Sequence, residues 1–149
     1  MASETTLDLG NRPLVLAAWP PAHTNCDLTV LDTTTGVLFT GDLVFVQHVP
    51  VVDASLTGWQ KLIPRLADLP ARLAVPGHGH AVMAWPQALE DERRYLAVLA
   101  EDARRQIAAG VPLARAVPEI GRSEAYRWEL FADYNPRNAT AAFSELEWQ

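Results

Sequence analysis

The chain has 149 residues and a formal net charge of −6, which fits one domain or a large part of one. Its hydrophobic content of 49% excludes wholesale disorder, and its acidity excludes a broad nucleic-acid-binding surface. The single cysteine, Cys26, excludes an intrachain disulfide and an all-cysteine metal site. The first ten residues lack the basic and apolar parts of a secretory signal, and no apolar run approaches the roughly 20 residues of a membrane helix.

The N-terminal part of the chain predicts short β-strands arranged as hairpins. Residues 5–9 and 14–19 flank a Gly-Asn-Arg-Pro turn, and residues 28–32 and 37–40 flank a turn rich in threonine. The apolar run continues beyond residue 40, but Asp42 interrupts it. A carboxylate buried in such a run is costly unless it is paired or bound to a metal.

A strand-helix-strand unit follows. Ser55 is a suitable N-cap for a helix over residues 56–68, and Pro64 predicts a kink or an early end of that helix. A short strand over residues 73–75 comes next. A helix between two strands is typical of a crossover connection, so this order predicts a mixed α/β fold.

The rest of the chain predicts helices alone. A long helix over residues 87–109 carries an apolar stripe, while its charged residues, Glu92 among them, are expected to be mostly solvated. Shorter helices are predicted within 111–120, near 124–133 and from Asn135-Pro136 to about residue 147. We therefore divide the chain into a β-rich segment, 1–84, and a helical extension packed on it, 85–149.

Three potential metal ligands stand at the ends of short predicted strands: His23, Asp42 and His78. Strand ends of a rigid sheet present side chains to a common cleft. Imidazole and carboxylate together suit zinc, manganese or iron, and a site with open positions is catalytic rather than structural. Glycines beside the ligands, Gly77 and Gly79 among them, allow a close approach of the backbone.

Other residues leave alternatives open. His80 is either a second ligand in a His-x-His pair or a residue that supports the ligands or lies on the surface, and His48 either touches substrate or is a solvated loop residue. For Cys26 we expect a small buried residue rather than a zinc thiolate. Asp27 is either the carboxylate that accepts a hydrogen bond from His23 and orients its ring, or a turn residue before the next strand.

Three segments resemble the second half of the metallo-β-lactamase superfamily: His23-Thr-x-x-Asp27-Leu, Leu38-Phe-x-Gly-Asp42-Leu, and Val75-Pro-Gly-His78-Gly. The resemblance implies half of an αββα sandwich with a mixed β-sheet, and a site for one or two zinc ions. By this resemblance His23 completes the ligand set of the first metal, Asp42 bridges the metals and takes part in catalysis, and His78 binds the second metal. The substrate-binding residues remain unknown.

Within the superfamily, the stretches 42–59 and 133–148 and the Pro-Gly-His-Gly segment are similar to the quinoprotein relay system zinc metallohydrolases, relatives of the SoxH type. This resemblance implies a small-molecule substrate, a periplasmic location and a functional link to quinoprotein alcohol dehydrogenases. It implies neither a nucleic-acid partner nor a membrane. Because the chain carries no predicted signal, a cytoplasmic location stays open.

The chain departs from the family pattern in one respect. The signature His-x-His-x-Asp-His of the first half is absent, since His80 is followed by Ala81-Val82. The resemblance therefore implies a truncated or half-domain chain with an incomplete site. Two hypotheses follow: a zinc-dependent hydrolase of ester, thioester or amide bonds, and a non-catalytic half-domain that binds a partner or self-associates through its open sheet edge. Whether this chain alone is an enzyme stays open.

Overall fold

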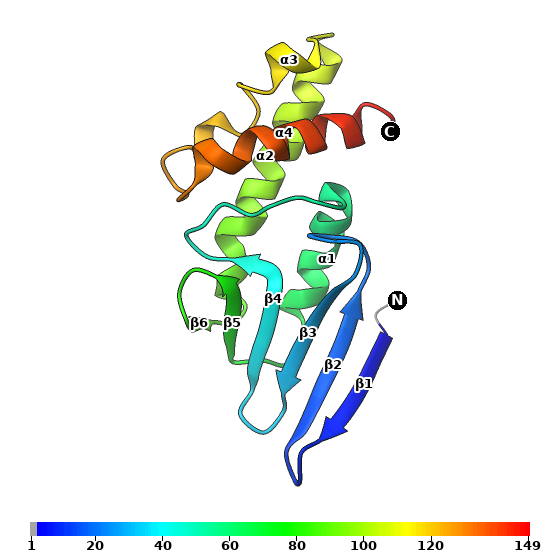
Figure 1. The fold of residues 1–149 in the computed structure, drawn as a ribbon, viewed down its shortest axis with the longest axis vertical. Helices are drawn as coiled ribbons and strands as arrows, with labels where there is room; N and C mark the ends of the chain where they lie inside the picture. Colours follow the sequence, from blue (N-terminus) through cyan, green and yellow to red (C-terminus); the bar gives the residue numbers. More distant parts are fainter. Residues whose placement is uncertain (1–2) are drawn as a thin grey trace.

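The structure, a computed structural model, describes residues 3–149. It is built on a six-stranded mixed sheet whose strands follow chain order, from β1 to β6 (Figure 1). The first four strands pair antiparallel: β1 (Ser3–Asp8), β2 (Pro13–Trp19), β3 (Asp27–Asp32) and β4 (Val37–Phe45). The strands predicted from short runs between turns are confirmed here.

The crossover connection is confirmed as well. Helix α1 (Leu56–Ala67) links β4 to β5 (Leu73–His78), which pairs parallel to β4. The hydroxyl of Ser55 accepts a hydrogen bond from the N–H of Gly58 at 2.9 Å, as expected of an N-cap. The helix continues through Pro64 and ends three residues later. A two-residue strand, β6 (Met83–Ala84), was not predicted and pairs antiparallel with β5.

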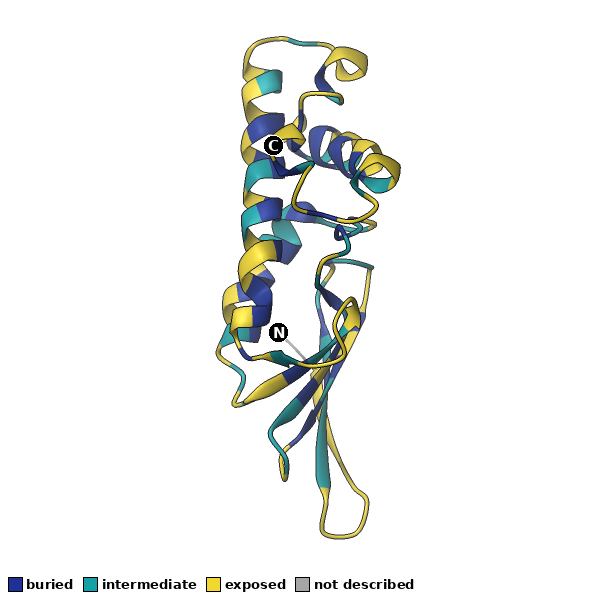
Figure 2. Ribbon diagram, turned by 90° about the vertical axis from the view of Figure 1, so that its left-hand side faces the viewer, coloured by how far each residue is buried: buried dark blue, intermediate teal, exposed yellow. Residues whose placement is uncertain are grey.

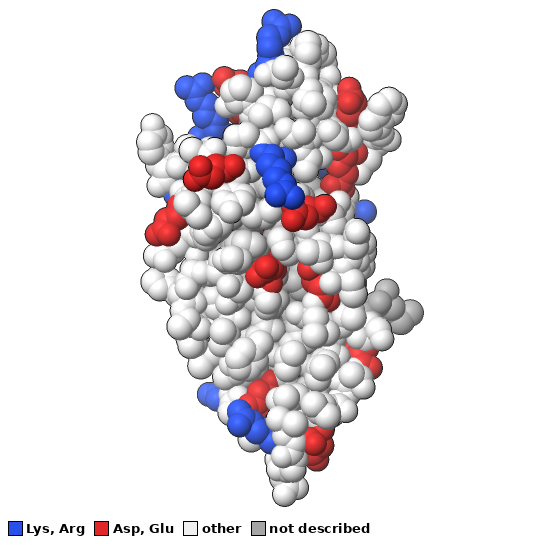
Figure 3. All heavy atoms as spheres, in the orientation of Figure 1, with Lys and Arg blue, Asp and Glu red and all other residues white. Residues whose placement is uncertain are grey.

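The two faces of the sheet differ. Figures 1 and 2 show α1 and α2 behind the sheet. Alternate strand residues such as Leu38 and Ala74 are buried. Alternate residues on the other face are exposed: Leu7, Leu28, Phe39 and Leu73 have relative exposures between 38% and 51%. Figure 3 views this open face and shows few charged atoms over the middle of the sheet.

The C-terminal part is helical, as predicted. The long predicted helix consists of a 3₁₀ turn, η1, continued by α2, and α4 lies across α2 above the end of the sheet (Figures 1 and 2). The elements are η1 (Gln87–Leu89), α2 (Glu90–Ala108), α3 (Leu113–Ala116), η2 (Arg122–Glu124) and α4 (Phe131–Leu146).

The predicted helix near residues 124–133 is wrong. The backbone of Glu129 bonds to the loop after β4 instead of to its own segment: its N–H donates to Gln47 O at 2.8 Å, and its carbonyl accepts from Val49 N at 3.1 Å. Leu130 then adopts φ 57°, and α4 begins at Phe131, four residues before the predicted start. Tertiary hydrogen bonds thus override the local helical pattern.

One hydrophobic core contains residues of both predicted segments, for example Leu38, Phe45 and Trp59 from the first and Tyr95 and Phe143 from the second. The sheet and the tail are therefore packed together over a common interior. No helix within residues 3–149 is long and apolar enough to span a membrane.

Candidate metal centre

The parallel pairing of β4 and β5 brings the carboxyl ends of both strands to the same edge of the sheet, the usual position of sites in such sheets. His78 is the last residue of β5, and it pairs with Phe45 at the end of β4. The register shifts between Gly41 and Phe45, so Asp42 lies in an irregular part of the strand. Its side chain is 43% exposed. The buried carboxylate expected from the apolar run is therefore half-exposed.

His23 reaches the same edge from the loop between β2 and β3. Its Nε2 lies 3.6 Å from Oδ2 of Asp42, and Nε2 of His78 lies 3.5 Å from Oδ1 of the same carboxylate. The three residues predicted as metal ligands thus lie together in the structure. They form a row in which the two imidazoles face different oxygens of Asp42.

The other nitrogen of His23 fixes the state of its ring. Nδ1 lies 2.6 Å from the carbonyl oxygen of Val51. A carbonyl oxygen only accepts hydrogen bonds, so in the neutral ring Nδ1 carries the hydrogen and Nε2 presents its lone pair toward Asp42. This is the tautomer that a metal ligand bound through Nε2 requires.

The loop that carries His23 is held by backbone bonds to the segment after β4. The N–H of Asp53 donates to His23 O, and the N–H of Ser55 donates to Ala22 O, both at 3.0 Å. The side chain of His23 is only 12% exposed. It is therefore the most tightly held member of the row.

Asp27 does not contact His23 through a described hydrogen bond. Its carboxylate accepts from the N–H of Thr24 at 3.1 and 3.2 Å and from the Thr24 hydroxyl at 2.7 Å. Of the two roles left open for Asp27, these bonds correspond to the turn residue, and the hydrogen-bond partner of His23 Nδ1 is the Val51 carbonyl. Asp27 instead fixes the turn that immediately follows His23.

Glycine is required at Gly77 by close packing against the row. A Cβ atom there would lie 2.1 Å from Oδ1 of Asp42 and 2.7 Å from the carbonyl of Gly41. Such distances are far below contact, so a side chain at this position would displace the carboxylate. The backbone of Gly77 thus approaches closely, as predicted, and the group that it approaches is the carboxylate of Asp42.

Aromatic rings form the floor beneath the two histidines. The ring of Phe45 stacks on His78 at 4.7 Å with an interplanar angle of 9°, and it meets His23 edge-on at 5.6 Å. Trp59 of α1 also meets His23 edge-on at 5.8 Å. Phe45 and Trp59 are buried, so the row is solvated only from its outer side.

Glu92 lies behind this floor, and its burial was not predicted. The side chain is fully buried, with one oxygen accepting from the N–H of Phe45 at 3.1 Å. Its other oxygen has no hydrogen-bond partner within residues 3–149. Burial raises the pKa of Glu92 well above its ordinary value, more than the Phe45 bond lowers it. The expectation of a mostly solvated glutamate is wrong because this position faces β4.

The remaining candidates lie around the row. His48 is half-buried, with its ring 5.1 Å from His78 and 5.5 Å from Tyr134, and its Nδ1 lies 2.9 Å from Val49 O. His80 is exposed. Cys26 is also exposed, so the prediction that it is buried is wrong. It lies in the turn that the Asp27 carboxylate fixes, on the solvent side.

The donor set fits a divalent metal, although not as a closed site. Zinc ligands at about 2.0–2.2 Å in a tetrahedral arrangement are about 3.3–3.6 Å apart, which matches the two distances to Asp42, 3.6 and 3.5 Å. A metal ion beside either oxygen of Asp42 would have one imidazole and one carboxylate oxygen as ligands. In the described part of the chain, no group of three or more His, Cys, Asp or Glu side chains is arranged to hold an ion by itself.

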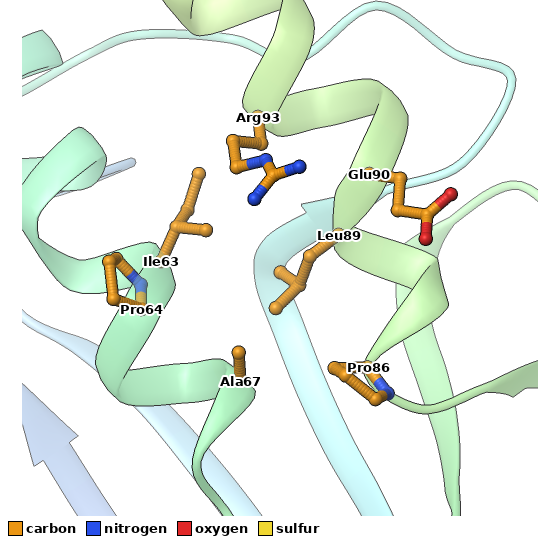
Figure 4. Close-up of a pocket in the computed structure, with 7 residues that line it drawn as sticks. All are labelled: Ile63, Pro64, Ala67, Pro86, Leu89, Glu90 and Arg93. Atoms are coloured by element: carbon orange, nitrogen blue, oxygen red, sulfur yellow. The ribbon is translucent and has the colours of Figure 1, made fainter.

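A separate cavity of about 200 Å³ lies between the end of α1 and the start of α2 (Figure 4). It is lined mainly by apolar side chains, with Glu90 and Arg93 at its side. None of the residues of the row lines it. The cavity and the row are therefore distinct features.

Comparison with known proteins agrees with this architecture. A family profile, the metallo-beta-lactamase superfamily, matches residues 1–78. The chain belongs to this superfamily. A comparison with curated proteins gave no match.

Solved structures show the same fold. The chain is similar to the sec-alkylsulfatase Pisa1 from Pseudomonas sp. (14% identity, TM-score 0.75, 96% of this chain and 25% of that one). It is similar to a metallo-beta-lactamase family protein from Thermus thermophilus (18%, 0.68, 97% and 46%). It is also similar to a metallo-beta-lactamase from Pontibacter korlensis (27%, 0.54, 65% and 47%). The chain thus spans between a quarter and a half of the length of these proteins.

Proposed function

We propose that this chain provides His23, Asp42 and His78 as metal ligands of a zinc-dependent hydrolase site. The observation that carries the proposal is the row itself, in which two imidazole nitrogens face the two oxygens of one carboxylate at 3.6 and 3.5 Å. Asp42 would contribute one oxygen beside each imidazole, so either half of the row would provide two ligands to a metal ion. Imidazole and carboxylate are common zinc ligands.

The chain's own residues have separate roles in this proposal. His23, held in its Nδ1–H tautomer by Val51, presents Nε2 as a rigid ligand. Asp42, half-exposed, would hold the metal and would accept a hydrogen bond from a water molecule, orienting it toward the substrate. When bound, zinc supplies the Lewis acidity that makes water a nucleophile near neutral pH. The proposed substrates contain an ester, thioester or amide carbonyl.

The alternative is a non-catalytic chain that binds a partner or a second copy. Two features favour it. Each half of the row has two ligands among residues 3–149. The open apolar face of the sheet gives such a chain a surface for association.

Within the superfamily, we place the chain with the quinoprotein relay system zinc metallohydrolases. The support is the similarity of residues 42–59 and 133–148 to those enzymes. A periplasmic location and a functional link to quinoprotein alcohol dehydrogenases belong to the same proposal. A test is the location of the tagged protein in its natural host; recovery only from the cytoplasm would contradict the periplasmic assignment.

Zinc titration followed by calorimetry tests the ligand assignment. We expect the wild-type protein to bind zinc. His23→Ala, Asp42→Asn and His78→Ala should each weaken zinc binding by at least about tenfold, because loss of a residue that only supports a metal ligand already weakens binding by about that factor. His80→Ala is the matched control, because His80 is an exposed histidine two residues from His78. It should bind zinc like the wild type.

The outcomes separate the two functions. Zinc binding together with zinc-dependent hydrolysis of an activated ester or thioester supports the hydrolase. Zinc binding without any turnover favours the non-catalytic alternative. If the wild-type protein takes up no zinc, or if His23→Ala binds as tightly as the wild type, the ligand assignment is wrong.

A further inference from the structure

Asn138, on α4, is fully buried and bonds to the backbone on both sides of Val51. Its Oδ1 accepts from the N–H of Val52 at 2.9 Å, and its Nδ2 donates to the carbonyl of Pro50 at 2.6 Å. A single side-chain amide therefore holds both neighbours of the residue whose carbonyl bonds to His23. The short segment 50–52 has little freedom to turn the Val51 carbonyl away.

Asn138 is itself held by other buried polar groups. Its Nδ2 also donates to the hydroxyl of Tyr95 at 2.9 Å, and that hydroxyl donates to Oδ1 of Asn135 at 2.9 Å. Nδ2 of Asn135 donates to the carbonyl of Ile120, again at 2.9 Å. The members of this chain satisfy one another's hydrogen bonds in a buried environment, while the two bonds to Val52 and Pro50 set the orientation of the Asn138 amide.

The chain of contacts ends at the proposed metal ligand. The Val51 carbonyl accepts from Nδ1 of His23 at 2.6 Å, and Nε2 on the opposite side of the ring faces Asp42. A shift of segment 50–52 would remove this acceptor and allow the hydrogen to move to Nε2. The ring could then no longer offer a lone pair to a metal beside Asp42.

We propose that Asn138 is a positioning residue of the metal centre, which sets the tautomer of His23 through the Val51 carbonyl. The proposal rests on the metal-ligand role of His23 proposed above. An amide is required because the N–H of Val52 needs an acceptor and the carbonyl of Pro50 needs a donor, and an amide side chain carries both groups side by side. A carboxylate at this position lacks the donor, and an aliphatic side chain lacks both. Asn138 lies within residues 133–148, one of the stretches that carry the family resemblance.

The first test needs no substitution and no metal. Two-dimensional ¹H–¹⁵N NMR of the metal-free wild-type protein distinguishes protonated from unprotonated ring nitrogens of His23. We expect a neutral ring with hydrogen on Nδ1 and none on Nε2. Hydrogen on Nε2 of the neutral ring would overturn the proposal, whatever the variants do.

The second test compares Asn138→Leu with Tyr95→Phe. The first substitution removes both bonds to segment 50–52, whereas the second removes a buried hydroxyl of the same network and leaves those bonds intact. We expect Asn138→Leu to increase the Nε2–H form of His23 and to weaken zinc binding by about tenfold, as for other lost outer partners of metal ligands. Tyr95→Phe should lower the melting temperature but keep the tautomer and the zinc affinity.

Equal tautomer populations in Asn138→Leu and Tyr95→Phe would overturn the proposal, since Asn138 would then act on stability alone. If Asn138→Leu does not fold, Asn138→Asp replaces it, because its shape is nearly the same and it loses only the donor. Zinc binding and tautomer are separate readouts. A wild-type protein that binds no zinc but shows the expected tautomer, lost in Asn138→Leu, would refute the metal centre, whereas the control of the His23 tautomer by Asn138 would stand.

Discussion

Glu92 lies in the interior with one carboxyl oxygen bonded to the N–H of Phe45 and the other without a partner within residues 3–149. Burial raises its pKa well above the ordinary value of 4.5. At a pH between the ordinary pKa and the raised pKa of the folded state, Glu92 keeps its proton in the folded protein and loses it in the unfolded chain. The free energy of unfolding is therefore expected to fall as the pH rises above 4.5, with a slope of up to about 1.4 kcal/mol per pH unit.

Urea denaturation at several pH values measures this slope. Glu92→Gln cannot ionise, and the variant should lose this part of the pH dependence. Glu101→Gln, an exposed change on the same helix, should retain it. Wild-type stability that is flat or rises over this range would contradict a protonated Glu92.

The predictability of the site differs from residue to residue. His23, Asp42 and His78 were predicted to converge because side chains at strand ends point to one edge, and the structure brings them together. The partner of His23 could not be predicted, because it is the Val51 carbonyl and a backbone group has no sequence signature. The exposure of Cys26 was also missed, since it depends on a local turn.

At the scale of the elements, the start of α1 depends on Glu145 of α4. Its carboxylate accepts from the N–H of Leu56 at 2.7 Å, from the N–H of Thr57 at 3.1 Å and from the Ser55 hydroxyl at 3.0 Å. Burial raises its pKa, but the bonds from Thr57, Leu56 and Ser55 together lower it below 4.5. Two elements that are far apart in sequence are joined at this point.

We expect Glu145→Ala to lower the free energy of unfolding at neutral pH by about 2 kcal/mol, as for other lost caps and charged hydrogen bonds. Because the folded pKa is the lower one, this stabilisation is present above pH 4.5 and is lost as the pH falls through the folded pKa. Chemical denaturation at neutral and acidic pH should show the difference from the wild type shrinking in acid. Glu147→Ala, an exposed neighbour, is the control; an equal loss there would contradict the capping role.

Most elements could be predicted because their signals are local. Short runs of strand-forming residues between turns mark the strands, and Ser55 marks the start of α1. The conformation of the segment before α4 could not be predicted, because the backbone of Glu129 forms hydrogen bonds with Gln47 and Val49 in the loop after β4. Such pairing depends on residues about 80 positions apart, and no local pattern records it.

For the molecule as a whole, we expect the open face of the sheet to govern association at high concentration. Phe39 is 47% exposed and Leu28 is 51% exposed on this face, and Figure 3 shows few charged atoms over the middle of the sheet. We expect concentration-dependent self-association in sedimentation velocity, because contiguous exposed apolar surface favours it. Phe39→Ser should shift the protein toward the monomer.

Tyr126→Ser provides the matched control, because Tyr126 is a fully exposed aromatic residue in the helical tail. It should leave the association unchanged. A wild-type protein that stays monomeric over the whole range, or equal effects of both substitutions, would show that the sheet face does not drive association.

The hydrogen bond between Val52 and Asn138 joins residues 86 positions apart, and the bond between Phe45 and Glu92 spans 47. Closing such long loops is slow in folding, because the entropy of closure is lost before the contacts form. On the ribosome, His23, Asp42 and His78 are synthesised well before α4. Segment 50–52 therefore acquires its final bonds only after α4 has emerged and docked, and the geometry around His23 is completed late in the order of folding.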